Sequence, residues 1–75
     1  MAKNLQLSGM IHAKYANESD FARALGWSRQ RLSKITNGHK YPDLFETENM
    51  AHALETSFSD LAQIFLSSKS TNVDN

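Results

Sequence analysis

The sequence contains no cysteine, only one proline and only three glycines among its 75 residues. The lack of thiols excludes a disulfide-stapled secreted fold, a thiolate metal site and a cysteine nucleophile. No apolar run approaches the roughly 20 residues of a membrane helix, and the first residues lack the apolar core of a signal peptide. We therefore expect one small domain in the cytoplasm, without a membrane segment.

The sequence also has no excess of charge of either sign: its eight Lys and Arg residues balance its eight Asp and Glu residues, so the formal net charge is zero. As a sum, this balance counts against nucleic-acid binding, which usually goes with a basic excess. The distribution is uneven, however: residues 21–42 contain five Lys or Arg and no acid, whereas residues 43–60 contain five acids and no Lys or Arg. We expect a dipolar domain with a basic side for a polyanion and an acidic side free for a partner protein.

Apolar residues recur at intervals of three and four, the period of an amphipathic helix. A first helix is expected from residue 7 to about residue 16. A second begins after an N-cap at Asn17 or Ser19 and ends at Gly26 in a left-handed C-cap. The inner faces consist of Leu7, Met10, Ile11 and Tyr15 in the first helix and of Phe21, Ala22 and Leu25 in the second.

Three more helices are expected. Ser28 caps the third, which Asn37 and Gly38 close, and a loop over residues 39–42 follows. Asp43 and Glu46 have the spacing of a capping box that opens a fourth helix, and Ser57 and Asp60 repeat this spacing before a fifth. The inner residues are Leu32 and Ile35, then Thr47, Met50, Ala51 and Leu54, then Leu61, Ile64 and Phe65, with Phe58 as a further core candidate. The prediction is an all-α, five-helix domain over residues 1–66 and a disordered polar tail over residues 67–75.

Residues 21–38 have the pattern of a helix-turn-helix. Ala22 is small enough for the two helices to approach closely, and Gly26 allows the sharp turn between them. The structural positions are completed by Trp27, Leu32, Ile35 and Gly38. At 100° per residue, Gln30 and Lys34 point outward from the third helix, Ser33 lies beside them, and Arg29 and Arg31 project from opposite flanks.

The outward side chains suit base and phosphate recognition. Arg29 can donate two hydrogen bonds to guanine, Gln30 can pair with adenine, and Lys34 suits guanine or phosphate. Arg31 and Lys40 are better placed to neutralise phosphates, which positions a protein without reading sequence.

The chain resembles the lambda-repressor-like, Cro-type helix-turn-helix regulators of phages and bacteria, over about residues 5 to 66. The matching residues are Phe21, Ala22, Leu25 to Ser28, Leu32, Ser33, Ile35, Asn37, Gly38, Pro42, Met50, Ala51, Ala53, Leu54 and Ser57. The resemblance implies that the third helix enters the major groove, with base contacts from Arg29, Gln30, Ser33 and Lys34. It makes His39, Lys40 and Tyr41, in the loop after the third helix, candidates for phosphate contacts. The predicted set of phosphate contacts is completed by Ser28, Arg31 and Asn37.

Two positions depart from the family pattern. Glu18 stands where members usually carry a glutamine that bonds a phosphate and braces the third helix, and its charge would repel that phosphate. Glu55 stands where the family prefers glycine, so we expect a helical or 3₁₀ continuation there rather than a left-handed cap.

The function predicted is a sequence-specific transcriptional regulator, a repressor, that binds double-stranded DNA as a homodimer on a palindromic operator. The alternative is a helix-turn-helix scaffold that acts through protein binding, such as an antirepressor with little DNA affinity; Glu18 and the neutral net charge motivate it.

No cofactor, metal site or enzymatic activity is expected, because His12, His39 and His52 do not converge and no nucleophile motif is present. Trp27 is expected to pack rather than stack on bases, and Leu66 either contributes to a dimer or is covered by the tail.

Overall fold

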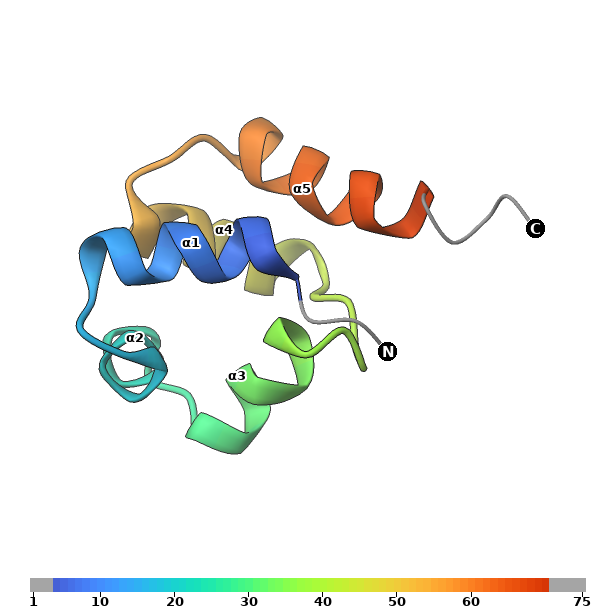
Figure 1. Ribbon diagram of the computed structural model, residues 1–75. Helices are drawn as coiled ribbons and strands as arrows, with labels where there is room; N and C mark the ends of the chain where they lie inside the picture. Colours follow the sequence, from blue (N-terminus) through green and yellow to red (C-terminus); the bar gives the residue numbers. More distant parts are fainter. Residues whose placement is uncertain (1–3, 71–75) are drawn as a thin grey trace.

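The computed structural model describes residues 4–70, and the side chains of residues 4–67. Five helices make up this part of the chain: α1 (Leu5–Lys14), α2 (Glu18–Leu25), α3 (Arg29–Thr36), α4 (Leu44–Leu54) and α5 (Phe58–Ser70). α1 and α4 lie between the α2–α3 pair and α5 (Figure 1). The expected all-α, five-helix fold is confirmed, and none of the helices in residues 4–70 has the length and apolar character to cross a membrane.

The helix ends follow the capping residues. The side chains of Asn17, Ser28 and Asp43 each accept the backbone N–H three residues further on, and Gly26 and Gly38 have φ values of 77° and 80°. α1 begins two residues earlier than expected, because Asn4 caps it by accepting the Leu7 N–H at 3.1 Å. It also ends two residues earlier, at Lys14, since the backbone of Tyr15 is extended. The Ser57 hydroxyl likewise accepts the Asp60 N–H at 3.0 Å before α5.

Three expectations differ from the structure. Glu55 has φ 56° and forms a left-handed cap after α4, so the predicted helical or 3₁₀ continuation is wrong; the Thr56 N–H bonds the Ala51 carbonyl there at 3.0 Å. Phe58 is 37% exposed rather than buried, because the first turn of α5 lies at the rim of the core. α5 also extends to Ser70, past the boundary expected at residue 66, and residues 71–75 of the expected tail lie outside the described residues.

One apolar cluster joins the helices. It consists of Leu7, Ile11, Phe21, Ala22, Leu32, Ile35, Met50, Ala51, Leu54, Leu61 and Phe65, with Met10, Tyr15, Leu25, Trp27, Ala53 and Ile64 partly buried against it. The Tyr15 ring lies 5.1 Å from that of Phe21, and the Tyr15 hydroxyl donates to the Ala53 carbonyl at 2.9 Å. These contacts connect α1, α2 and α4, and Leu32 and Ile35 of α3 pack into the same cluster.

Candidate nucleic-acid interface

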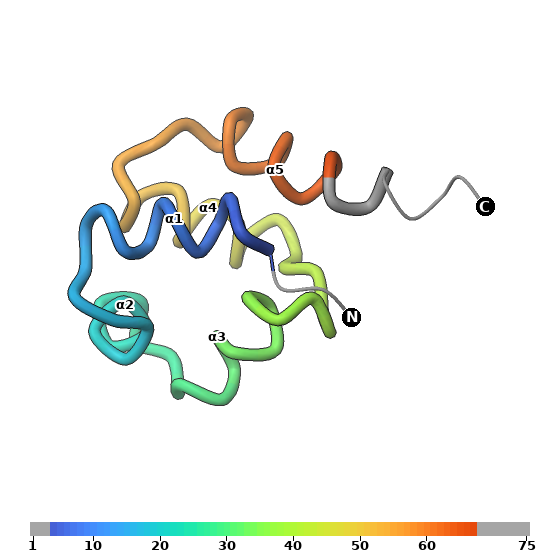
Figure 2. The backbone as a smooth tube through the Cα atoms, viewed as in Figure 1, coloured from blue at the N-terminus to red at the C-terminus, as the bar shows by residue number. Residues whose placement is uncertain are grey.

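The turn between α2 and α3 is short because one residue, Trp27, separates the C-cap of α2 from the N-cap of α3. The Gly26 N–H bonds the Arg23 carbonyl at 3.1 Å, and the Trp27 N–H bonds the Ala22 carbonyl at 2.9 Å. Gly26 adopts the left-handed conformation that these bonds require without the backbone strain that a residue with a side chain would have at φ 77°. The backbone trace shows this short turn and the longer loop between α3 and α4 (Figure 2).

The inner side of α3 is anchored at its C-terminal end. Thr36 is fully buried, and its carbonyl accepts the Asn4 N–H at 2.9 Å. The Thr36 hydroxyl lies 3.3 Å from Glu18 Oε1, so the first residue of α2 braces the last residue of α3. These bonds hold the axis of α3 against α1 and α2. Sequence reasoning missed Asn4. At Glu18 it named the bracing role of the family's glutamine but not Thr36 as the residue contacted.

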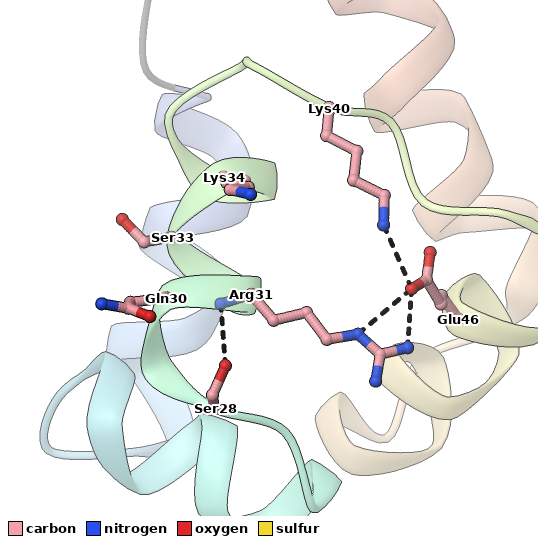
Figure 3. A pocket seen from close by; sticks show the side chains of 7 residues that line it. All are labelled: Ser28, Gln30, Arg31, Ser33, Lys34, Lys40 and Glu46. Atoms are coloured by element: carbon pink, nitrogen blue, oxygen red, sulfur yellow. Dashed lines mark hydrogen bonds and ion pairs between the residues drawn. The ribbon is translucent and has the colours of Figure 1, made fainter.

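The outer side of α3 carries the predicted base-contact residues. Arg29, Gln30 and Lys34 are exposed, and Ser33 is half-buried. Gln30 and Ser33 project on one side of the helix, whereas Arg31 reaches across the other side toward α4 (Figure 3). The Ser33 hydroxyl accepts a hydrogen bond from Asn37 Nδ2 at 2.9 Å, so a predicted base contact and a predicted phosphate contact bond each other.

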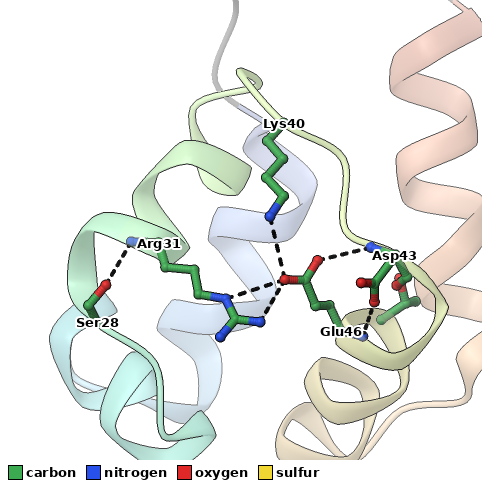
Figure 4. Close-up of polar contacts among 6 residues, drawn as sticks. Ser28, Arg31, Lys40, Asp43 and Glu46 are labelled. Carbon is green, nitrogen blue, oxygen red and sulfur yellow. Dashed lines mark hydrogen bonds and ion pairs between the residues drawn. The ribbon is translucent and has the colours of Figure 1, made fainter.

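Arg31 belongs to an ion cluster that the sequence did not predict. Its Nε and Nη2 donate to Glu46 Oε2 at 3.3 Å and 2.7 Å, and Lys40 Nζ lies 3.5 Å from the same oxygen (Figure 4). The Arg31 guanidinium also stacks on the Trp27 ring, 4.3 Å from its centroid. Trp27 itself packs half-buried against the core. We call Arg31, Lys40 and Glu46 the ion cluster.

The carboxylate of Glu46 serves two purposes. Its Oε1 accepts the Asp43 N–H at 3.0 Å while Asp43 accepts the Glu46 N–H at 2.7 Å, which is the capping box expected at the start of α4. The Asp43 N–H and then the Arg31 guanidinium hold the pKa of Glu46 below its ordinary value, with a smaller contribution from Lys40 and against the effect of burial. Glu46 is therefore a buried but charged acid beside α3.

A polar groove of about 660 Å³ runs along this side of α3. It is lined by Ser28, Gln30, Arg31, Ser33, Lys34, Lys40 and Glu46. The structure thus brings three of the predicted phosphate contacts, Ser28, Arg31 and Lys40, to one place next to Lys34. His39 is exposed but does not line the groove, and Tyr41 packs edge-on against Phe65 with centroids 6.5 Å apart.

The prediction that the basic and acidic stretches form two separate sides of the domain is partly wrong. Glu46 comes from the acidic stretch but lies on the basic side, because the capping box turns its carboxylate toward α3. Glu55 pairs with Lys14 at 2.9 Å, and Arg23 pairs with Asp20 at 3.1 Å. Among the five basic residues of 21–42, Arg29 and Lys34 have no ion-pair partner in the described part of the chain.

Nothing in the described residues gathers metal ligands. His12, His39 and His52 are exposed, and no group of three or more His, Asp or Glu side chains converges within residues 4–67. Independently of this, the exposed cations Arg29 and Lys34 and the polar side chains of the groove can donate hydrogen bonds and neutralise anions.

Comparison with known proteins identifies a family for this chain. A family model described as helix-turn-helix, of the Cro/C1 type, matches residues 17–61, which is more than half of the chain. The matched range begins at the N-cap of α2 and ends in α5, so it contains α3 and the ion cluster. No curated protein and no solved structure shows a significant match.

Proposed function

Because the chain belongs to the Cro/C1-type helix-turn-helix family of DNA-binding transcriptional regulators, we propose that it is a repressor that inserts α3 into the major groove of a specific operator. The observation that carries this proposal is the outer side of α3. Arg29, Gln30 and Lys34 are exposed there, and the two cations, Arg29 and Lys34, form no ion pair among the described residues. A face of donors without an acid at its centre suits base edges flanked by phosphates.

The proposal assigns two roles. Arg29, Gln30, Lys34 and Ser33 read base edges, and a good bidentate pair contributes about 1–3 kcal/mol of discrimination. The phosphate contacts come from Ser28, Arg31 and Lys40 in the groove and from Asn37, His39 and Tyr41 after α3. These contacts position α3 without carrying sequence information.

The proposed unit on DNA is a homodimer on a palindromic site. An apolar groove of about 300 Å³ lies between the start of α4 and α5, lined by Tyr41, Pro42, Leu44, Thr47, Phe58, Ala62, Phe65 and Leu66. Leu44 and Leu66 are 70% and 57% exposed, so a second copy would bury apolar surface here. Leu66→Glu should weaken operator binding by placing a charge in this contact, and sedimentation of the protein with operator DNA would measure the loss of the dimer.

Selection of bound sequences from a random duplex library tests the function. A palindromic enriched site is the expected result, and no enrichment would contradict the proposal. On the enriched site, Lys34→Ala should weaken binding about 10-fold or more. Lys14→Ala removes the same charge from the far end of α1 and is the matched control, expected to change affinity little.

The second candidate function is a scaffold that binds a partner protein. Phe45, 82% exposed next to Leu44, is the observation that favours it, since a large exposed apolar side chain suits a protein contact. A salt titration with plain duplex DNA separates the two candidates. Binding that falls steeply as salt rises supports the regulator, and no binding at low salt supports the scaffold.

A further inference from the structure

Glu46 places a carboxylate where the two half-exposed cations of the ion cluster converge. Arg31 arrives from α3 and Lys40 from the loop after it, and both reach the same oxygen, Glu46 Oε2. The acid comes from α4, a third segment of the chain. Three segments thus meet at one oxygen beside the groove of α3, as Figure 4 shows.

The acid and the cations differ in their freedom. The Glu46 side chain is 8% exposed and is held by the Asp43 N–H, whereas the side chains of Arg31 and Lys40 are 45% and 46% exposed. The carboxylate is therefore fixed in place by the folded structure, whereas the charged groups of Arg31 and Lys40 are accessible from the groove. A guanidinium has five N–H donors, of which Glu46 takes two, so Arg31 keeps donors for another anion.

The same geometry limits what the cations can do for DNA. Two cations sharing one carboxylate leave a net charge of +1 on the ion cluster rather than +2. A backbone phosphate entering the groove must compete with a carboxylate that is already bonded, and it meets the repulsion of that carboxylate at short range. The affinity that depends on charge alone is reduced most, because it has no base contacts to compensate.

We propose that Glu46 is a positioning residue that holds Arg31 and Lys40 at the edge of α3 and lowers the affinity for DNA of unrelated sequence by competing with phosphate. This inference rests on the proposed DNA-binding function. It makes a residue of the acidic stretch part of the specificity of the interface, although Glu46 touches no base.

Glu46→Gln tests the proposal in the full chain. Glutamine keeps the size of the side chain and the acceptor of the capping box, but it removes the charge. Glu48→Gln is the matched control: it removes the same charge from the same helix at an exposed position whose acid lies 3.8 Å from His52. Thermal unfolding of both variants establishes that they are folded before binding is measured.

The expected result is tighter binding of Glu46→Gln than of Glu48→Gln to a duplex of unrelated sequence. Each further phosphate that a protein neutralises makes the slope of log affinity against log salt more negative by about 0.9. Between about 50 and about 200 mM salt, Glu46→Gln should therefore lose about threefold more affinity than Glu48→Gln. The preference for the selected operator over unrelated DNA should fall. Equal slopes and equal affinities of the two variants, or weaker binding by Glu46→Gln, would overturn the proposal.

A titration with pyrophosphate, followed by the NMR resonances of Lys40, which every variant retains, separates this proposal from the DNA-binding function. Glu46→Gln should saturate at several-fold lower pyrophosphate concentration than the wild type and Glu48→Gln, and this gain should vanish in the double variant Arg31→Gln with Glu46→Gln. Identical titrations of all the proteins would refute the role of Glu46. Wild-type protein that binds no duplex at low salt would refute the DNA-binding function, while the pyrophosphate titration still decides about Glu46.

Discussion

At the residue scale, Glu55 occupies a backbone conformation that suits glycine. Its φ of 56° lies in the left-handed region, which costs an L-residue about 1–2 kcal/mol. The hydrogen bonds that close α4 require this conformation, since the N–H groups of Glu55 and Thr56 bond the carbonyls of His52 and Ala51. The exposed ion pair with Lys14 lowers the pKa of Glu55 but offsets little of the backbone strain.

Comparison of two substitutions isolates this strain. Glu55→Gly and Glu55→Ala both remove the ion pair, but only glycine relieves the backbone. We expect Glu55→Gly to be more stable than Glu55→Ala by about 1 kcal/mol in urea denaturation. Equal stability of the two variants would show that the left-handed cap is not strained.

The charge of Glu46 makes stability depend on pH. Its pKa is lower in the folded than in the unfolded chain, so its stabilising contribution is present above the unfolded-state pKa and is lost as the pH falls through the folded-state pKa. Glu46→Gln should be less stable than the wild type by about 1–3 kcal/mol at neutral pH. This difference in unfolding free energy should shrink as the pH falls from about 5 to about 3. A difference that stays constant over this range would contradict the assignment of a charged Glu46.

At the scale of the element, side-chain caps determine where the short helices begin. α2 and α3 have eight residues each, too few to be stable as isolated helices. Caps at Asn17 and Ser28 bond the N–H groups that the first turns would leave unpaired. The exposed face of α3 can therefore remain polar while its ends are held.

The capping box of α4 offers a test at this scale. Asp43→Ala removes the acceptor for the Glu46 N–H and should cost about 0.5–2 kcal/mol of unfolding free energy. Asn49→Ala, at an exposed position of the same helix, should stay within about 0.5 kcal/mol of the wild type. Chemical denaturation of both variants measures the effect, and equal stabilities would show that the box contributes nothing.

At the scale of the whole molecule, one small core supports both the fold and the interface. Phe21 is fully buried at the junction of α1 and α2, and a domain of this size has little stability to lose. Phe21→Ala should cost about 3–5 kcal/mol and leave much of the chain unfolded by circular dichroism. Phe45→Ala, which truncates the same side chain at an 82% exposed position, should remain folded. An unfolded Phe45→Ala would contradict the prediction that stability depends on the burial of the side chain.

The local parts of the fold were accessible from the sequence because they depend on neighbours in the chain. The N-caps at Ser28 and Asp43, the left-handed turn at Gly26 and the buried positions Leu32 and Ile35 follow from spacings of a few residues. The same spacing placed Gln30 and Lys34 on the outer side of α3, where the structure has them exposed. The glycine preference misled only at Glu55, where the helix-closing hydrogen bonds override the cost of a side chain at positive φ.

By itself, then, the sequence determined that the chain forms an all-α helix-turn-helix domain and which face of α3 is outermost. Only the tertiary structure decided how the charges meet. Arg31 and Glu46 are 15 positions apart, and their contact depends on the angle at which α4 leaves the loop after α3. Charge counted along the chain separates them into opposite halves, but Coulomb attraction acts through space, and the capping box brings the acid to the basic side.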